Sequence, residues 1–337
     1  MQTEEIGSLS TYFVTGGTGL LGNSIVRELC GRGLTVRVLC RPGSPRTPFE
    51  DLPVEIIEGD LNQPAVLDAG IAGCTAVFHC AALIHLGWTQ LEESRRVNVE
   101  GTRHVADACL RHGCRLIHVS TVDTLPTARS QSKPIDERGL DGIANVPCSY
   151  VVSKTEAEQV VRQAIAKHQL DAVIVHPGFM LGFYDWKPSS GRMFLQVTQA
   201  PVVVGPPGGC SLCDAQEVAK ACVTAAGQGV SSQNYILAGE NIKFRKLWRR
   251  MLRIAGSRKP VLPLGKRVSW GGAVIDWANR RFSLPERDVN GATIRMANLY
   301  HFYDSSKAQR ELGYNPQLSD ARLTEIWEWL KAHHREA

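Results

Sequence analysis

The feature that most restricts the fold of this chain is a glycine-rich run near its start, Thr15-Gly-Gly-Thr-Gly-Leu-Leu-Gly22. It follows an apolar strand candidate and opens a helix candidate, which is the context of a dinucleotide-binding turn. Gly16 permits the tight bend, Gly19 lets the backbone approach a pyrophosphate, and Gly22 allows close packing of helix on sheet. The free N–H groups and dipole of the helix start then favour phosphates. The other residues of the run predicted to contact the dinucleotide are Thr18, Leu20 and Leu21.

Strands and helices alternate over the first 180 residues. The strand candidates are 12–15, 34–40, 54–57, 76–80, 115–120 and 172–176, and the helix candidates lie near 20–32, 64–72, 92–112 and 150–168. This alternation predicts an α/β fold with a doubly wound (Rossmann) parallel sheet, whose ligand lies outside the carboxyl ends of the strands.

The sequence pattern changes after Pro177, where proline and glycine become frequent and the alternation of strand and helix candidates is lost. We therefore expect a dinucleotide-binding domain over 1–180. Residues 181–337 should form mainly a smaller C-terminal α/β substrate lobe, with some segments returning to the first domain.

Composition indicates an ordinary globular protein of 337 residues. No run approaches the length of a membrane span, and the first ten residues lack the basic and apolar regions of a signal peptide, so we expect a cytoplasmic protein. The ten cysteines are scattered and are expected to be reduced core residues. Cys210 and Cys213 have metal-like spacing without a second pair nearby, and we expect no metal site.

Positive charge is concentrated between residues 240 and 285, which hold twelve Lys or Arg and two acidic residues. Within this region, 243–253 has the pattern of a basic amphipathic helix. A solvated helix face is the favoured interpretation, and peripheral contact with a membrane surface is the alternative. Nucleic acid is not expected as a partner, because no binding motif accompanies the charge.

A second motif, Tyr150-Val-Val-Ser-Lys154, carries the predicted chemistry. The four-residue spacing brings both side chains to one face of a helix. An ammonium beside a phenol favours the phenolate, so Tyr150 is predicted to exchange a proton nearer neutral pH than a free tyrosine does. Alone this pair is a weak signal, but together with the glycine-rich turn it indicates hydride transfer.

The second strand candidate ends in Leu39-Cys-Arg41 without the acidic residue that usually accepts the ribose 2′-hydroxyl of NAD. The planar fork of Arg41 could pair with a 2′-phosphate instead. NADP(H) is therefore the preferred cofactor, and NAD(H) the alternative. Asp60, after the third strand, suits contact with the adenine amino group, or it caps a turn.

These motifs together resemble the extended short-chain dehydrogenase/reductase family, also described as the NAD-dependent epimerase/dehydratase family. Within it, the chain looks closest to the dihydroflavonol-4-reductase-like and 3β-hydroxysteroid-dehydrogenase-like branch, near the hopanoid-associated sugar epimerase-like proteins. The matching segments are 15–22, Gly59-Asp-Leu61, His79-Cys-Ala-Ala82, Asn98-Val-Glu-Gly-Thr102, Val119-Ser-Thr121, Tyr150–Lys154, His176-Pro-Gly178, 185–192, 234–241 and 303–316.

The resemblance implies roles for individual residues. Tyr150 would be the general acid/base, Lys154 would lower its pKa and hold the nicotinamide ribose, and Thr121 would bind the substrate oxygen. Asn98 would support the active-site helix. The remaining residues implied at the cofactor are Leu61, Cys80, Ala81, Ala82, Ser120, Pro177 and Gly178. The resemblance also implies a homodimer through the helices near 92–112 and 150–168.

Two departures from the family pattern bear on function. His176 stands where many members have arginine, and Val122-Asp-Thr follows Thr121, without the dehydratase signature. The expected substrate walls are mainly apolar or aromatic, which favours a cyclic or hydrophobic small molecule over a sugar nucleotide. They include His85, Val122, Phe179, Met180 and Trp186, with Leu83, Ile84, Trp88 and Phe183 as further candidates.

The leading prediction is therefore an NADP-dependent oxidoreductase that interconverts a hydroxyl and a ketone on such a substrate. The alternatives are a nucleotide-sugar epimerase with tightly held NAD(P), and a non-catalytic dinucleotide-binding protein. Thr121, Tyr150 and Lys154 together argue against the non-catalytic alternative.

Overall fold

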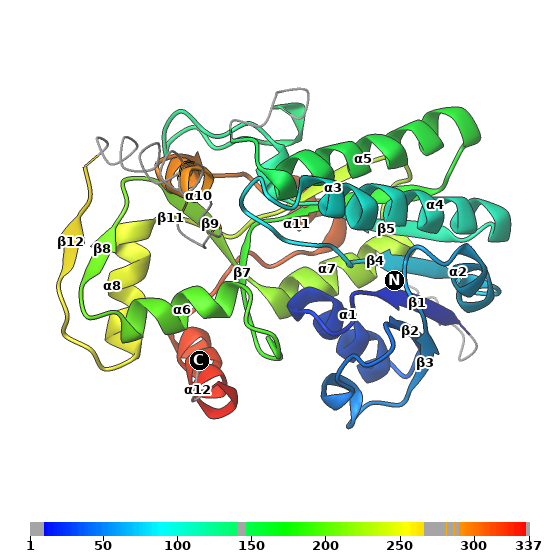
Figure 1. Cartoon of the computed structure of the whole chain (residues 1–337), viewed down its shortest axis with the longest axis horizontal. Helices are drawn as coiled ribbons and strands as arrows, with labels where there is room; N and C mark the ends of the chain where they lie inside the picture. Colours follow the sequence, from blue (N-terminus) through cyan, green and yellow to red (C-terminus); the bar gives the residue numbers. More distant parts are fainter. Residues whose placement is uncertain (1–9, 140–145, 266–280, 282–285, 287–289, 335–337) are drawn as a thin grey trace.

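A parallel sheet of seven strands forms the centre of the protein, in the order β10-β6-β5-β4-β1-β2-β3 (Figure 1). The computed structural model describes residues 10–139, 146–265, 281, 286 and 290–334. The strands are β1 (Thr11–Thr15), β2 (Thr35–Cys40), β3 (Val54–Glu58), β4 (Ala76–His79), β5 (Arg115–Val119), β6 (Ala172–Pro177) and β10 (Asn234–Leu237). The strand order reverses between β1 and β4, and ligands of such sheets bind at this switch point.

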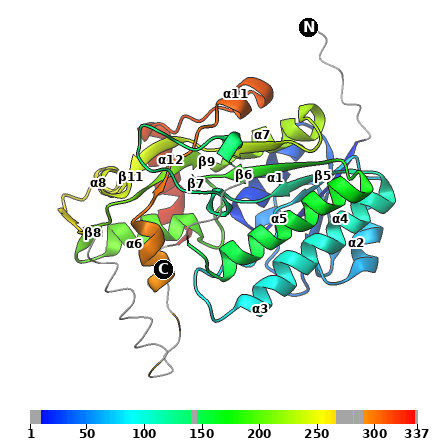
Figure 2. The same ribbon diagram turned by 90° about the horizontal axis from the view of Figure 1, so that it is seen from above.

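Helices cover both faces of the sheet (Figure 2). On one face α1 (Leu20–Gly31) packs against α7 (Ala215–Gln228), and on the other α4 (Gly101–His112) packs between α2 (Pro64–Ile71) and α5 (Ser149–His168). Each face buries its own apolar cluster, one lined by the α1 residues Ile25 and Leu29, the other by the α2 residues Leu67 and Ile71. The predicted doubly wound Rossmann fold is confirmed.

The helix predicted over 92–112 is interrupted. It consists of α3 (Leu91–Ser94), a π-helical segment η2 (Arg95–Glu100) and then α4, which ends at Gly113 with φ +63°. A π-helical turn widens the helix by one residue and is common at functional sites. It carries Asn98, one of the predicted site residues.

The second half of the chain builds a smaller lobe at the carboxyl ends of the central strands and also returns to the central sheet, where β10 and α7 lie. Its main sheet has the order β11-β9-β13, with β7 paired to β9, and β8 pairs with β12. The strands are β7 (Phe179–Leu181), β8 (Val203–Gly205), β9 (Gly209–Asp214), β11 (Glu240–Lys243), β12 (Val261–Pro263) and β13 (Tyr300–His301); the helices are α6 (Ser190–Gln199), α8 (Phe244–Ile254), α10 (Gly291–Ala297), α11 (Ser306–Leu312) and α12 (Asp320–His333).

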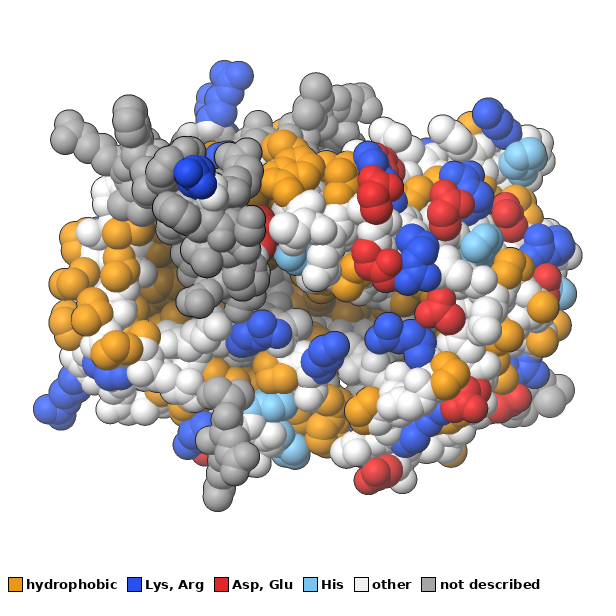
Figure 3. Space-filling model, viewed as in Figure 1, with side chains coloured by type: hydrophobic (Ala, Val, Ile, Leu, Met, Phe, Trp, Pro, Cys, Tyr) orange, Lys and Arg blue, Asp and Glu red, His pale blue; other side chains and the backbone are white. Residues whose placement is uncertain are grey.

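The predicted basic helix corresponds to α8. Its inner face buries Leu247 and Met251, and its exposed stripe holds Lys246, Arg249 and Arg253. Beyond it, hydrophobic side chains gather on the β8–β12 ribbon at the left end of the molecule in Figure 3. They include Val202, Val204 and Leu262 at 60%, 39% and 48% exposure. Among the described helices, none has the length and apolar character needed to cross a bilayer.

Candidate active site

The glycine-rich turn packs directly against the chain that follows β4. Gly16 has φ +71°, and a Cβ on it would lie 2.6 Å from the Ala81 nitrogen. A Cβ on Gly22 would lie 2.2 Å from the Gly16 oxygen. Real Cβ atoms do not approach backbone this closely, so glycine is required at both positions. The predicted turn thus sits at the switch point between β1 and β4.

The start of α1 fits a pyrophosphate. Gly19 is the N-cap, no side chain caps the helix, and its first turn contains no acidic residue. The backbone N–H groups of the first turn, from Leu20 to Gly22, therefore have no partner within the helix. Free N–H groups at the positive end of a helix dipole bind phosphate, so these residues suit the dinucleotide.

A buried polar chain supports this turn from within the sheet. The His79 ring bonds through Nδ1 to Thr15 Oγ1 at 2.8 Å and through Nε2 to Thr102 Oγ1 at 2.9 Å. Thr102 Oγ1 in turn donates to the Asn98 carbonyl oxygen at 2.6 Å. Burial lowers the pKa of His79 to about 3, so the ring is neutral. The chain links β1, β4 and the π-helical segment.

Arg41, predicted to pair with a 2′-phosphate, is exposed just beyond β2. Sequence reasoning missed Arg46, which lies beside the Cys40 thiol at the end of the same strand and pairs with Glu58 at 2.7 Å. Asp60 caps its own turn, because its Oδ1 accepts from the backbone nitrogen of Asn62 at 3.0 Å.

The remaining predicted cofactor residues lie at or just after the ends of β3, β4 and β6. The Cys80 nitrogen donates to the Thr15 oxygen at 3.3 Å, so β4 and the turn after it stay paired to β1. Pro177 ends β6, and the Gly178 nitrogen donates to the Leu237 oxygen at 3.1 Å. Leu61 is buried, and its carbonyl oxygen bonds to the His104 ring. Ala82 is partly buried just after β4.

The predicted reactive hydroxyls converge. Thr121 follows β5, Tyr150 lies in the first turn of α5, and the Thr121 side chain lies close enough to the Tyr150 phenol to favour its deprotonation. Burial, together with the negative charge of Asp123, raises the pKa of Tyr150 above its usual value. This differs from the expectation that Lys154 would lower this pKa, because Lys154 is not among the groups that shift it, and burial and Asp123 both act in the opposite direction.

Lys154 is buried one helical turn beyond Tyr150. Its Nζ donates to the Val119 carbonyl oxygen at 2.6 Å, at the end of β5. Burial lowers its pKa to about 8, although the negative charge of Glu158 acts in the opposite direction. The ammonium is therefore fixed next to the strand that leads to Thr121.

Asn98 joins three elements at the predicted active-site helix. Its Nδ2 donates to Ser153 Oγ at 2.8 Å and to the Leu83 oxygen at 3.0 Å, and its Oδ1 accepts from the Leu83 nitrogen at 2.7 Å. The π-helical segment thereby holds both α5 and the chain after β4.

The loop after β4 provides hydrogen-bond acceptors for the first backbone N–H groups of helix α5. The His85 and Gly87 oxygens accept from the Tyr150 and Ser149 nitrogens at 3.1 and 2.7 Å. The His85 ring, predicted to belong to the substrate wall, bonds through Nε2 to Glu286 Oε2 at 2.9 Å. Glu286, from the second half of the chain, also accepts from Thr89 Oγ1 at 2.9 Å.

The other predicted substrate residues pack into the lobe. Phe179 and Met180 form β7 and contact two different core clusters, and Val122 is buried with Tyr303. Trp186 stacks edge-on against Trp329, with ring centroids 5.3 Å apart. These contacts explain the apolar character that sequence reasoning assigned to a substrate wall.

Three polar residues near the reactive hydroxyls were missed. Asp123 Oδ2 accepts from Thr121 Oγ1 at 3.4 Å, and Asp123 Oδ1 lies 3.3 Å from the Nδ1 of His301 in β13. Glu158 accepts from Ser120 Oγ at 2.8 Å. Glu158 lies four residues after Lys154, the spacing of one helix face, which was the available signal in the sequence.

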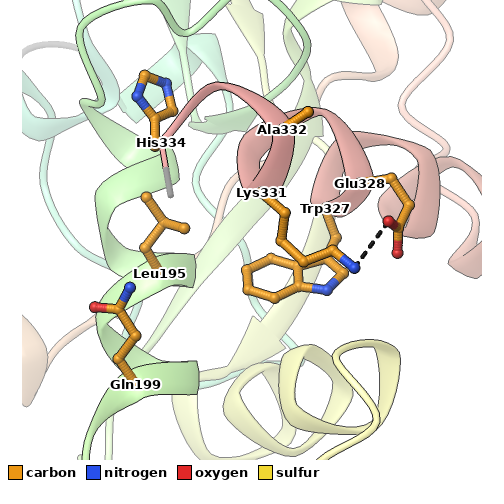
Figure 4. Close-up of a pocket in the computed structure, with 7 residues that line it drawn as sticks. All are labelled: Leu195, Gln199, Trp327, Glu328, Lys331, Ala332 and His334. Atoms are coloured by element: carbon orange, nitrogen blue, oxygen red, sulfur yellow. Dashed lines mark ion pairs between the residues drawn. The ribbon is translucent and has the colours of Figure 1, made fainter. Parts of the chain in front are cut away.

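A groove of about 350 Å³ opens between α6 and α12 (Figure 4). None of the predicted site residues lines it. Its lining residues are Leu195, Gln199, Trp327, Glu328, Lys331, Ala332 and His334. The groove is therefore distinct from the site at the strand ends.

Comparison with curated proteins finds relatives over nearly the whole chain. Sterol demethylase protein B of Methylococcus capsulatus is 29% identical, covering 95% of this chain and 98% of that protein. The 3 beta-hydroxysteroid dehydrogenase type 7 of Mus musculus is 27% identical and covers 95% of each chain.

Solved structures with the same fold include that of gox2253, with 33% identity, a TM-score of 0.84 and coverage of 97% of this chain and 100% of that one. A nucleoside-diphosphate-sugar epimerase from Pseudomonas aeruginosa has 24% identity, a TM-score of 0.78 and coverage of 96% and 98%. Residues 12–238 match the model of the NAD dependent epimerase/dehydratase family. The chain belongs to this family and is an NAD(P)-dependent oxidoreductase that uses a nicotinamide dinucleotide cofactor.

Proposed function

We propose that this protein is an NADP-dependent enzyme that interconverts a hydroxyl and a ketone on a small, cyclic or hydrophobic substrate. One observation carries the proposal. The Thr121 side chain lies near the Tyr150 phenol, and buried Lys154 lies one helical turn beyond Tyr150, at the same edge of the sheet as the glycine-rich turn. Relatives named as a steroid dehydrogenase and a quinoline-oxide ketoreductase support a ring-containing substrate.

The proposed chemistry divides among the residues as follows. The nicotinamide supplies or accepts the hydride. Thr121 donates a hydrogen bond to the substrate oxygen and stabilises the negative charge that grows there. Tyr150 gives that oxygen its proton during reduction and removes it during oxidation. Lys154 binds the nicotinamide ribose hydroxyls.

The preference for NADP rests on the charge beyond β2. Arg41 is exposed there, Arg46 lies at the end of the same strand, and no acidic residue follows Cys40 directly. Two guanidinium groups near one strand end favour a 2′-phosphate. Glu58 opposes this preference, because it already pairs with Arg46.

The proposed function can be tested by following NADPH absorbance while the protein is incubated with a panel of ketones. The panel includes a flavonoid ketone, an oxosteroid and a long-chain acyclic ketone. We expect net NADPH oxidation with at least one ring-containing ketone, and loss of this activity in Tyr150→Phe. The alternative of a nucleotide-sugar epimerase is favoured if the purified protein retains its cofactor and converts a sugar nucleotide without net NADPH consumption.

A further inference from the structure

Glu158 is a buried charge that the mechanism above does not use. It lies one helical turn beyond Lys154 and two beyond Tyr150, so that the three side chains share one face of α5. Only 8% of Glu158 is exposed. A buried carboxylate is costly unless polar partners surround it, so we examined which groups contact Glu158.

The carboxylate joins the two elements that carry the reactive groups. Ser120 Oγ donates to Glu158 Oε2 at 2.8 Å, and Ser120 directly precedes Thr121 at the end of β5. Thr124 Oγ1, just after Thr121, lies 3.4 Å from the same oxygen. Glu158 itself belongs to α5, the helix of Tyr150 and Lys154.

Neighbouring side chains fix Glu158 in turn. Arg162 Nε donates to Glu158 Oε1 at 3.0 Å, while Arg162 Nη2 donates to Asn234 Oδ1 at 2.8 Å. His176 Nδ1 lies 3.8 Å from Glu158 Oε2 and 3.3 Å from the Thr121 carbonyl oxygen. His176 is the residue at which the sequence departs from the arginine of many family members.

The negative charge of Glu158 also raises the pKa of Lys154, whereas burial lowers it and so favours the neutral amine. The groups around Lys154 differ in their effect. Burial keeps His79 and His118 uncharged, and it also raises the pKa of the Cys80 thiol to about 12. The other titratable or charged groups that face Lys154 or Glu158 are Tyr150, Arg162 and His176.

We propose that Glu158 is a positioning residue, which ties the segment that carries Thr121 to the helix that carries Tyr150 and Lys154 and holds the Lys154 ammonium in its charged form. This inference rests on the proposed function for the roles of Thr121 and Tyr150. The electrostatic part concerns Lys154 alone and can be measured without a substrate.

The test measures NADPH affinity by fluorescence from about pH 6 to about pH 10. Binding should weaken as Lys154 loses its proton, because the neutral amine binds the ribose hydroxyls less well. In Glu158→Gln the negative charge is gone, so we expect the midpoint of this loss to move to lower pH by about one unit. Near pH 6 both proteins should bind NADPH with similar affinity.

Glu158→Asp separates charge from position. It keeps the charge, so the midpoint should stay in place, but the shorter side chain withdraws from Ser120. Turnover of the best ring-containing ketone should then fall about tenfold with little change in KM for NADPH. Glu156→Gln is the matched control, because Glu156 lies on the same helix as Glu158 but pairs with Arg95 of the π-helical segment, at 2.8 Å. It should change neither quantity.

An unchanged midpoint in Glu158→Gln, or an equal shift in Glu156→Gln, would overturn the electrostatic role. Normal turnover in Glu158→Asp would overturn the positioning role, and this variant decides the matter if Glu158→Gln does not fold. If the unmodified protein reduces no ketone, the proposed function fails, while the NADPH measurement still decides the role of Glu158.

Discussion

Thr121 Oγ1 donates a hydrogen bond to Asp123 Oδ2 at 3.4 Å, which brings a carboxylate next to the hydroxyl expected to bind the substrate oxygen. The same carboxylate contributes to the raised pKa of Tyr150. A negative charge near a phenol disfavours the phenolate, so Asp123 delays proton loss from Tyr150 as pH rises. A residue that sequence reasoning overlooked therefore influences both reactive groups.

Asp123→Asn should lower the pKa of Tyr150. Alcohol oxidation needs the deprotonated phenol, so its rise with pH should begin at lower pH, by about half a unit or more. The measurement is kcat/KM for oxidation against pH. His301, the other partner of Asp123, is unchanged in this variant. Asp136→Asn, which removes a surface partner of Arg138, is the control and should leave the profile in place.

Tyr150→Phe removes the proposed proton donor while keeping the ring in its packing. Turnover should fall by about 10²- to 10⁴-fold, the usual contribution of general acid–base catalysis. Affinity for NADPH should change by less than about twofold, because the phenol oxygen is a minor part of the cofactor site. Steady-state kinetics and fluorescence titration measure the two effects, and near-normal turnover would exclude the acid/base role.

Gly22→Ala should disrupt the dinucleotide turn, since the added methyl would lie 2.2 Å from the Gly16 oxygen. We expect loss of NADPH binding and a lower Tm. Gly31→Ala, at the other end of the same helix, meets no atom within 4 Å. It should bind NADPH normally and gain about 0.5 to 1 kcal/mol of stability, because alanine favours helix. Similar behaviour of the two variants would contradict this account of the turn.

Arg41→Ala and Arg46→Ala should each weaken NADPH binding about tenfold with a smaller effect on NADH, because a 2′-phosphate loses a charged partner. Dissociation constants for both cofactors measure this change. Arg32→Ala, which breaks only a surface pair with Glu28, is the control. Tighter binding of NADH than NADPH by the unmodified protein would remove the argument for NADP.

His118→Leu should preserve or raise stability by about 1 kcal/mol, since His118 is buried and both ring nitrogens lack a partner in the described structure. Burial lowers the pKa of His118, so the unfolded chain takes up the proton first as pH falls below about 6.5. Protonation of His118 in the unfolded chain therefore lowers the free energy of unfolding below that pH and has no effect on it above that pH. Chemical unfolding should show a flatter acid dependence in the variant.

The sequence predicted the fold well because it is encoded locally. All six predicted strands of the first 180 residues are present, and the helices over 20–32, 64–72 and 150–168 begin and end close to the predicted residues. The π-helical interruption was not predicted, because it depends on how Asn98 bonds to Ser153 and Leu83 across the tertiary structure.

Gly16, Gly22 and Tyr150 could be proposed as site residues because a glycine pattern or a spacing marks them in the sequence, and their roles stay predictions. Arg46, Asp123 and Glu286 were missed because their positions depend on contacts between segments distant in sequence. The homodimer and the membrane contact of 243–253 stay predictions.

The placement of β10 at the edge of the central sheet ties the two halves of the chain together. Residues 234–237 shield one side of β6, and α7 packs beside α1 on one face of the sheet. A fragment that stops near residue 180 would leave a bare strand edge and an uncovered apolar helix, both of which promote aggregation. A segment from the second half of the chain thus completes the central sheet, and we expect the chain to fold as a single cooperative unit.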